Sequence, residues 1–353
     1  MKLAVIGVGA FGRNHLRVYR ELAAAQMPTA SPVKLVTLVE QDAERAAELR
    51  ASFASENNPP IVFSSLDELL AARSRGDLSI DAASVCVPTS DHFKTASALL
   101  TAGIDLLVEK PIAVTLDEAD RMIALAQQHG RVLQIGHLER FNPAITAAER
   151  ICKAPMFFEA HRLSVFSPRA LDVDVVLDLM VHDLDVVLHL AQSAVTSVHA
   201  VGLPIVSPKV DIANVRVEFA SGCVANFTAS RISTERVRKL RFFQPHQYVS
   251  IDYARKDLLV IDAHPDMLGN LLNQQPEAVP KSQSALPPGL TLTPPQIFAG
   301  EPLRLEIEAF LEAVQSRAIP RVSGQDGCAA LALALQINAS IAAHAARTGL
   351  GRP

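Results

Sequence analysis

Residues 2–15, KLAVIGVGAFGRNH, limit the possible folds of this chain more than any other stretch. A short apolar run ends in Gly7, Gly9 and Gly12, which form a GxGxxG pattern, and a helical stretch follows. In that context the first glycine permits a tight turn, the second lets the backbone approach a pyrophosphate, and the third allows a helix and a strand to pack closely. The stretch therefore predicts the first strand and the phosphate turn of a dinucleotide-binding domain.

A secretory leader is the competing interpretation of this stretch, because Lys2 precedes an apolar run. Glycines interrupt that run, Arg13 closes it, and no cleavage site of small residues follows at once. We therefore expect the segment to remain in the folded protein.

Length and composition favour a globular protein of two domains. The chain has 353 residues, more than one compact core usually holds. Its net charge of -4 gives no global attraction to nucleic acid or to an anionic membrane. The four cysteines stand far apart without a CxxC pair, which indicates neither a zinc finger nor a disulfide scaffold and fits a reducing cytoplasm. We therefore expect a cytoplasmic protein with no nucleic-acid or membrane partner.

The apolar stretch at residues 328–346 is the only other candidate for a membrane span. It contains Gln336, Asn338, Ser340 and His344, which would be costly in lipid. The sequence therefore predicts a buried or half-buried terminal helix.

The first part of the chain alternates short β-branched runs with longer helical stretches, a pattern typical of a parallel sheet with crossover helices. The expected strands cover residues 2–7, 33–40, 61–64, 82–88, 105–110 and 131–136. A helix is expected over residues 116–130, with acidic residues in its first turn and Gly130 as its end. The fold class predicted for residues 1–138 is an α/β Rossmann domain.

The pattern changes in residues 139–353, which predict an α+β domain with a mostly antiparallel sheet. A strongly apolar helix at residues 173–191 is followed by several strands with no helix between them. Those strands are expected at residues 213–220, 223–233, 237–245 and 247–253. Residues 264–302, rich in Pro, Gln and Ser, predict a long loop, and the terminal helix could pack back on the first domain.

Glu40 ends the second predicted strand, where an acidic side chain can accept hydrogen bonds from the adenosine ribose and would repel a 2′-phosphate. Its distance from the glycines is longer than usual, which we attribute to the insert at residues 23–32. A solvated glutamate at a strand end is the alternative interpretation. The position favours NAD over NADP as the cofactor.

Glu109 and Lys110, in the sequence VEKP, lie at the carboxyl end of another predicted strand, the edge at which such sheets bind ligands. Spacing alone favours a surface ion pair over a catalytic lysine. Proline at position 111 fixes the local chain and keeps the lysine off a continuing helix.

Asp178, His182, Asp185 and His189 form one stripe on the apolar helix at residues 173–191. The stripe is either a solvated face or the floor of a cleft in which Asp178 orients His182 for proton transfer. A metal held by Asp178, His182 and Asp185 is a third alternative. Chemistry on a nicotinamide needs no metal, so none is expected.

Four motifs together resemble the glucose–fructose oxidoreductase / inositol dehydrogenase (Gfo/Idh/MocA) family of NAD(P)-dependent sugar oxidoreductases. They are the glycine pattern at residues 7–12, VPTSDH at 87–92, EKP at 109–111 and the DxxxH of Asp178 and His182. The resemblance implies that the second domain has a large open sheet, often used for dimer or tetramer contacts. A homodimer or homotetramer is therefore expected.

The resemblance also implies roles by position, with Lys110, Asp178 and His182 as the catalytic residues. The substrate's C–H would deliver hydride to the nicotinamide, and its O–H proton would leave to His182, helped by Lys110. Residues matching the family's cofactor-binding positions are Gly7, Gly9, Ala10, Phe11, Gly12, Glu40, Pro88, Thr89, His92, Glu109 and Lys110. A non-catalytic NAD-binding regulator is the alternative from another functional class.

Residues 136–144 and 160–185 narrow the resemblance to a bacterial branch similar to UDP-N-acetylglucosamine 3-dehydrogenases. This branch implies oxidation of the 3-hydroxyl of a UDP-N-acetylhexosamine. The residues expected to bind that substrate are Arg140, Asn142, Arg162 and Arg169, since guanidinium groups match a diphosphate. A free sugar or an inositol remains the alternative substrate.

Overall fold

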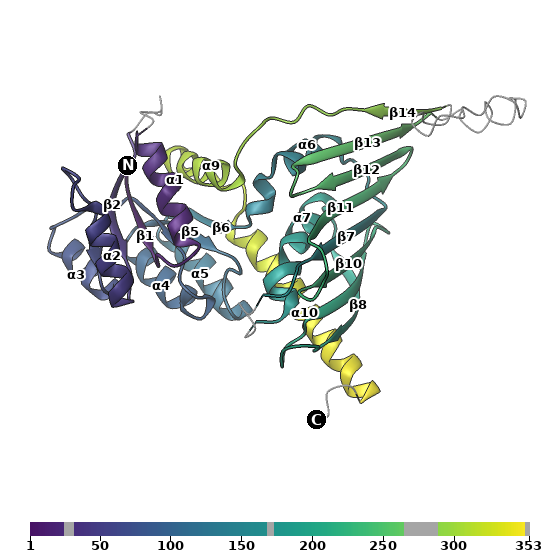
Figure 1. The fold of residues 1–353 in the computed structure, drawn as a ribbon, viewed down its shortest axis with the longest axis horizontal. Helices are drawn as coiled ribbons and strands as arrows, with labels where there is room; N and C mark the ends of the chain where they lie inside the picture. Colours follow the sequence, from purple (N-terminus) through teal and green to yellow (C-terminus); the bar gives the residue numbers. More distant parts are fainter. Residues whose placement is uncertain (25–31, 168–172, 265–288, 350–353) are drawn as a thin grey trace, which may run out of the picture. The chain divides into compact units, whose positions relative to one another are not determined.

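The computed structural model describes residues 1–24, 32–167, 173–264 and 289–349 (Figure 1). They divide into two units, the first comprising Met1–Leu138 with Glu301–Leu331 and the second Glu139–Gly300 with Ala332–Pro353. The second unit is not continuous from residue 139 to the end of the chain, because Glu301–Leu331 belongs to the first unit.

The first unit contains a six-stranded parallel sheet in the order β3-β2-β1-β4-β5-β6. The strands are β1 (Lys2–Ile6), β2 (Lys34–Val39), β3 (Ile61–Phe63), β4 (Ala82–Val85), β5 (Asp105–Glu109) and β6 (Leu133–Gly136). The helices are α1 (Gly12–Ala24), α2 (Ala43–Phe53), α3 (Leu66–Ser74), α4 (Thr89–Thr101), α5 (Leu116–Gln128) and α9 (Pro302–Ser316). The predicted Rossmann fold and its six strands are confirmed. The strand order reverses between β1 and β4, and ligands bind at such a switch point in open α/β sheets.

Local sequence accounts for the ends of α5. Thr115 and Glu118 form a capping box, in which each side chain accepts a hydrogen bond from the other's backbone N–H. Gly130 follows the helix with a φ of 59°, a left-handed conformation that glycine adopts without strain. The predicted helix is therefore present, ending two residues earlier than expected.

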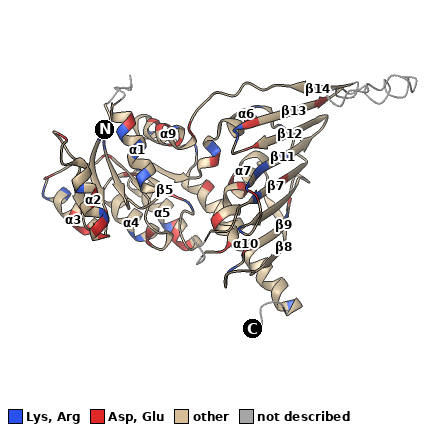
Figure 2. Cartoon of the chain, viewed as in Figure 1, with Lys and Arg blue, Asp and Glu red and all other residues tan. Residues whose placement is uncertain are grey.

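Helix α9 belongs to the first unit although it follows the whole sheet of the second unit in sequence. Its apolar residues Leu303, Ile307 and Phe310 join Val18 and Tyr19 of α1 in one buried cluster. Acidic and basic side chains are interspersed along the helices of this unit (Figure 2).

The second unit contains an eight-stranded sheet in the order β14-β13-β12-β11-β7-β10-β9-β8, antiparallel except for the parallel pair β7 and β10. The strands are β7 (Phe157–Leu163), β8 (Val195–Leu203), β9 (Ile212–Phe219), β10 (Val224–Ser230), β11 (Val237–Gln244), β12 (Gln247–Asp252), β13 (Asp257–Ala263) and β14 (Leu290–Thr293). Besides α9, the helical segments described after the first unit's sheet in the sequence are a 3-10 turn (Leu138–Phe141), α6 (Pro143–Ile151), a π-helical turn (Val176–Met180), α7 (Val181–Ala191) and α10 (Gly324–Thr348). The predicted α+β class is confirmed.

One face of this large sheet packs against α6, α7 and α10 to form the unit's core. By length and composition α10 could cross a membrane, a test that a core helix also passes. Leu333, Ala334, Ile337 and Ile341 of α10 are buried in the core, as a helix of a folded domain requires.

The sequence identified β9 to β12 and missed β7, β8, β13 and β14. Strand β14 corrects the expected loop at residues 264–302, while residues 265–288 of that loop lie outside the described part of the chain.

Candidate active site

The glycine turn joins β1 to α1 and is packed as tightly as its sequence suggests. Gly7 has a φ of 84°, and a Cβ on it would lie 2.9 Å from the backbone of Cys86. A Cβ on Gly12 would lie 2.0 Å from the Gly7 carbonyl oxygen. A Cβ on Gly9 would meet nothing within 4 Å, so the space beside this backbone is open for a ligand. Ala10 and the 40% exposed Phe11 follow at the start of the helix.

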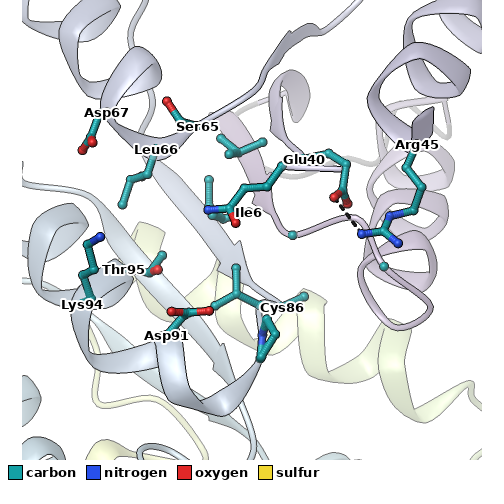
Figure 3. A pocket seen from close by; sticks show the side chains of 16 residues that line it. Ile6, Glu40, Arg45, Ser65, Leu66, Asp67, Cys86, Asp91, Lys94 and Thr95 are labelled. Carbon is teal, nitrogen blue, oxygen red and sulfur yellow. Dashed lines mark hydrogen bonds and ion pairs between the residues drawn. The ribbon is translucent and has the colours of Figure 1, made fainter. Parts of the chain in front are cut away.

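A cleft of about 500 Å³ lies at the carboxyl ends of β1, β2 and β4 (Figure 3). It is therefore at the switch point of the sheet. The cleft is lined by Ile6, Gly7, Gly9, Val39, Glu40, Gln41, Arg45, Ser65, Leu66, Asp67, Cys86, Val87, Pro88, Asp91, Lys94 and Thr95. Four of the predicted cofactor-binding residues thus line one cleft: Gly7, Gly9, Glu40 and Pro88.

Glu40 is only 4% exposed, so the interpretation as a solvated strand-end glutamate is wrong. Its carboxylate accepts hydrogen bonds from the backbone N–H of Val8 at 3.0 Å, that of Asp42 at 2.9 Å and the Arg45 guanidinium at 3.1 Å. Burial alone would raise the pKa of Glu40, but the hydrogen bonds from Arg45, Asp42 and Val8 outweigh it and hold the pKa below its ordinary value. Glu40 therefore presents a negative charge at the cleft. Sequence reasoning missed Arg45, although it follows Glu40 by only five residues.

His92 of the VPTSDH motif is 1% exposed and bridges two loops. Its Nδ1 lies 2.9 Å from the carbonyl oxygen of Pro111, and its Nε2 lies 3.0 Å from that of Val87. Burial lowers the pKa of this imidazole. Both ring nitrogens face backbone carbonyls, and a neutral imidazole donates to only one of them, so His92 lies between the loop that carries Pro88 and Thr89 and the EKP segment.

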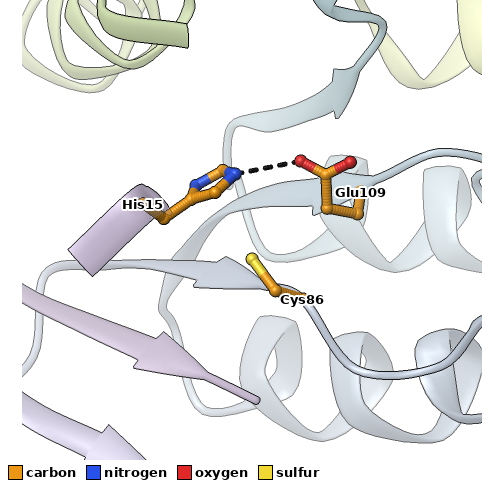
Figure 4. A group of neighbouring side chains, drawn as sticks. All are labelled: His15, Cys86 and Glu109. Carbon is orange, nitrogen blue, oxygen red and sulfur yellow. Dashed lines mark hydrogen bonds and ion pairs between the residues drawn. The ribbon is translucent and has the colours of Figure 1, made fainter. Parts of the chain in front are cut away.

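Glu109 and Lys110 stand at the end of β5, as predicted. The Glu109 side chain is 13% exposed, and its Oε1 lies 3.0 Å from Nε2 of the fully buried His15 (Figure 4). Glu109 is therefore not at the exposed position that the surface ion pair suggested by spacing would require. Sequence reasoning missed His15, which follows the last glycine of the turn by three residues.

Cys86 is the third member of this group, and one donor atom from each of His15, Cys86 and Glu109 lies within 4.8 Å of the others. Burial raises the pKa of the Cys86 thiol well above its ordinary value, and Glu109 adds to the effect. The Cys86 thiol is therefore protonated when no cation is bound next to it.

In the second unit, Asp178 lies in the π-helical turn and His182 in the first turn of α7. π-Helical turns are rare and occur frequently at functional sites. Asp185 is 2% exposed and its Oδ1 lies 3.3 Å from the Arg140 guanidinium, while His189 lies 2.8 Å from Glu149. A uniformly solvated face is therefore wrong for this stripe.

Arg140, Asn142 and Arg162 are all nearly inaccessible, and carboxylates surround them. Arg162 donates to Asp183 at 2.7 and 3.0 Å and to Glu139 at 3.1 Å. Asn142 donates to the same Glu139 at 3.1 Å. Their side chains thus have partners within the unit's own framework, and a diphosphate would have to compete with these carboxylates, so the contact stays a prediction. Arg169 lies outside the described residues.

Arg238 of β11 pairs with Arg162 of β7 across the sheet, and its side chain shares the face of that network. Among the described residues, nothing forms a hydrogen bond or an ion pair with its guanidinium. The Arg238 side chain is exposed, but partial desolvation and the positive charge of Arg162 lower its pKa. Sequence reasoning missed this residue, because the motif spacing gives it no signal.

Family models match both parts of the chain. Residues 1–137 match an oxidoreductase family with an NAD-binding Rossmann fold, and residues 156–244 match the GFO/IDH/MocA C-terminal domain. The chain belongs to the GFO/IDH/MocA oxidoreductase family.

Similar proteins in this family are dehydrogenases. The UDP-N-acetylglucosamine 3-dehydrogenase of Acidithiobacillus ferrooxidans is 34% identical over 98% of this chain and 99% of its own. A solved structure of that protein has a TM-score of 0.81 and covers 97% of this chain and 98% of its own. The scyllo-inositol 2-dehydrogenase (NAD(+)) of Bacillus subtilis is 26% identical over 66% of this chain and 68% of its own. The chain is thus an NAD-binding dehydrogenase acting on CH–OH groups, which argues against a non-catalytic regulator.

Proposed function

We propose that this member of the GFO/IDH/MocA family oxidises the 3-hydroxyl of a UDP-N-acetylhexosamine with NAD. The observation that carries the proposal is the 34% identity, over 98% of the chain, to a UDP-N-acetylglucosamine 3-dehydrogenase. The chain also keeps Lys110, Asp178 and His182 at the family's motif positions.

The residues around the glycine turn fit a bound NAD, because the backbone at Gly9 is open while Gly7 and Gly12 tolerate no side chain. Bound NAD supplies the hydride acceptor. In the proposed mechanism His182 accepts the proton of the sugar hydroxyl, Asp178 orients the imidazole, and the Lys110 ammonium stabilises the developing negative charge on oxygen.

Glu40 supports NAD as the cofactor in preference to NADP. Glu40→Gln removes the charge and leaves a single acceptor oxygen, so either the Val8 N–H or the Asp42 N–H and the Arg45 guanidinium lose their acceptor. We expect the ratio of the Kd for NADP to the Kd for NAD to fall about 10-fold or more, because a charged hydrogen bond contributes about 1.5–3 kcal/mol. Isothermal titration calorimetry with both nucleotides measures this ratio. Glu44→Gln, an exposed change on α2, is the control, and an unchanged ratio in Glu40→Gln would remove Glu40 from cofactor selection.

The substrate is tested by NADH formation with UDP-N-acetylglucosamine, free glucose and myo-inositol, each with a carbonyl-trapping reagent. We expect reduction of NAD only with the nucleotide sugar, and a product two hydrogens lighter by mass spectrometry in a parallel reaction without the trapping reagent. Reduction only with a free polyol would leave a dehydrogenase of this family and discard the nucleotide-sugar substrate.

Arg238 is our candidate for the diphosphate contact. Arg238→Met should raise the KM for the nucleotide sugar about 10- to 100-fold, the loss expected for one charge-assisted hydrogen bond. Inhibition by UDP, measured in the same assay, should weaken by a similar factor. An unchanged UDP inhibition constant would exclude this role for Arg238.

We also propose a homodimer or homotetramer that uses the open face of the second unit's sheet. Phe157, Phe243 and Tyr248 form a connected aromatic cluster there, with ring centroids 5.7 and 5.0 Å apart. Large exposed apolar patches often mark protein–protein contacts.

The free cysteines, among them Cys86 and Cys223, support a cytoplasmic location.

A further inference from the structure

A chain of hydrogen bonds runs through the first unit from α1 to the end of β5. The Tyr19 hydroxyl lies 2.7 Å from Ser84 Oγ, Ser84 Oγ lies 3.0 Å from His15 Nδ1, and His15 Nε2 lies 3.0 Å from Glu109 Oε1. Tyr19, Ser84 and His15 are completely buried. Polar side chains at such depth are costly unless they are satisfied, so the chain requires a specific arrangement of protons.

The direction of the hydrogen bonds follows from what each group can do. An ionised Glu109 carboxylate can only accept, so His15 Nε2 carries the hydrogen. With a neutral imidazole, Nδ1 then accepts from the Ser84 hydroxyl, and Ser84 accepts from Tyr19. Burial raises the pKa of Tyr19, which therefore remains a donor. One tautomer of His15 thus satisfies every member.

Gly136, on the neighbouring parallel strand β6, lies against the same carboxylate. Glu109 of β5 pairs with Gly136 of β6, and a Cβ on Gly136 would lie 2.8 Å from Glu109 Oε1. The carboxylate therefore occupies the space that any larger residue at position 136 would need.

We propose that His15 is a positioning residue that fixes Glu109 and, through it, the backbone from which the Lys110 side chain leaves. Lys110 follows Glu109 directly, at the point where β5 ends. A shift of the Glu109 backbone would displace the Lys110 Cα, because a single planar peptide unit joins the two residues. The inference rests on the proposed catalytic role of Lys110.

Two substitutions at His15 separate positioning from general stability. A glutamine amide reaches approximately the position of Nε2, so His15→Gln keeps a donor to Glu109 and loses the contact with Ser84. An asparagine amide reaches approximately the position of Nδ1, so His15→Asn keeps the contact with Ser84 and loses Glu109. Both side chains are neutral and polar, so a merely structural role predicts similar losses of activity.

We expect His15→Asn to lower kcat about 100-fold, the scale of a small misplacement of a catalytic group, with the Kd for NAD changed less than about 3-fold. His15→Gln should keep kcat within about 5-fold of the wild type. Gly136→Ala, which displaces the carboxylate from the other side, should resemble His15→Asn. Equal kcat losses in the Asn and Gln variants would overturn the proposal.

A second readout needs no substrate. Lysines are reductively methylated with ¹³C, and the Lys110 resonance is assigned with Lys110→Arg. The chemical shift of this resonance should change in His15→Asn and stay at its wild-type value in His15→Gln. Equal changes in the two variants would again overturn the proposal. If the wild type oxidises no nucleotide sugar, the proposed function fails, while this measurement still decides the role of His15.

Discussion

Lys110→Ala should lower kcat for sugar oxidation about 1,000-fold, within the range expected when a group acting in proton transfer or charge stabilisation is lost. The Kd for NAD should change little, because the described cleft residues and the glycine turn are unaltered. His182→Ala should show the same pattern. Steady-state kinetics with the identified sugar and NAD titration of the same preparations measure both quantities.

Lys34→Ala is the matched control for the lysine substitution, since Lys34 is exposed at the start of β2. It should retain wild-type kcat. If Lys110→Ala and His182→Ala both keep near-normal turnover, the catalytic assignment is wrong, whatever the substrate. If the two variants lose NAD binding as well, their kinetic loss says nothing specific about proton transfer and the expectation is also contradicted.

Arg162→Met should lower the free energy of unfolding by about 3–5 kcal/mol, the cost of leaving buried charges without their partner. Arg162 has a side-chain exposure of 4%, and the substitution would strand the carboxylates of Asp183 and Glu139. Chemical denaturation followed by circular dichroism measures the change.

Arg241→Met provides a matched control on the same sheet. Arg241 of β11 forms an ion pair with Glu159 of β7 at 2.9 Å, but the Arg241 side chain is 36% exposed. Its loss should cost less than about 1 kcal/mol, because solvent screens the pair. Comparable destabilisation by the two substitutions would show that the Arg162 network is not the buried framework described above.

Local sequence patterns determined the first unit's sheet and the position of the glycine turn. Strand β1 is buried from Leu3 to Ile6, and such continuous apolar runs are typical of parallel strands covered on both faces. The glycines can be recognised from the sequence because the turn conformation at Gly7 and the close approach of Gly12 to the Gly7 carbonyl involve residues nearby in the chain. The capping box of α5 is local for the same reason.

The second unit's sheet was only partly predictable, because β7 combines apolar residues with a buried arginine. If every charged residue is assumed to be exposed, the alternation of β7 is not recognised and Arg162 is interpreted as a ligand-binding residue. Its place in the buried framework depends on Asp183 and Glu139, which lie 21 and 23 residues away in sequence.

The sequence by itself thus determined the dinucleotide domain, the family motifs and the acidic residue at the end of β2, since these follow from short-range periodicity and turn geometry. Tertiary structure alone decided that α9 returns to the first unit, that Arg162 belongs to the framework, and that His15 meets Glu109 across 94 residues. The physical reason is that a buried charge or polar group is defined by its partner, and folding brings that partner from a distant part of the chain.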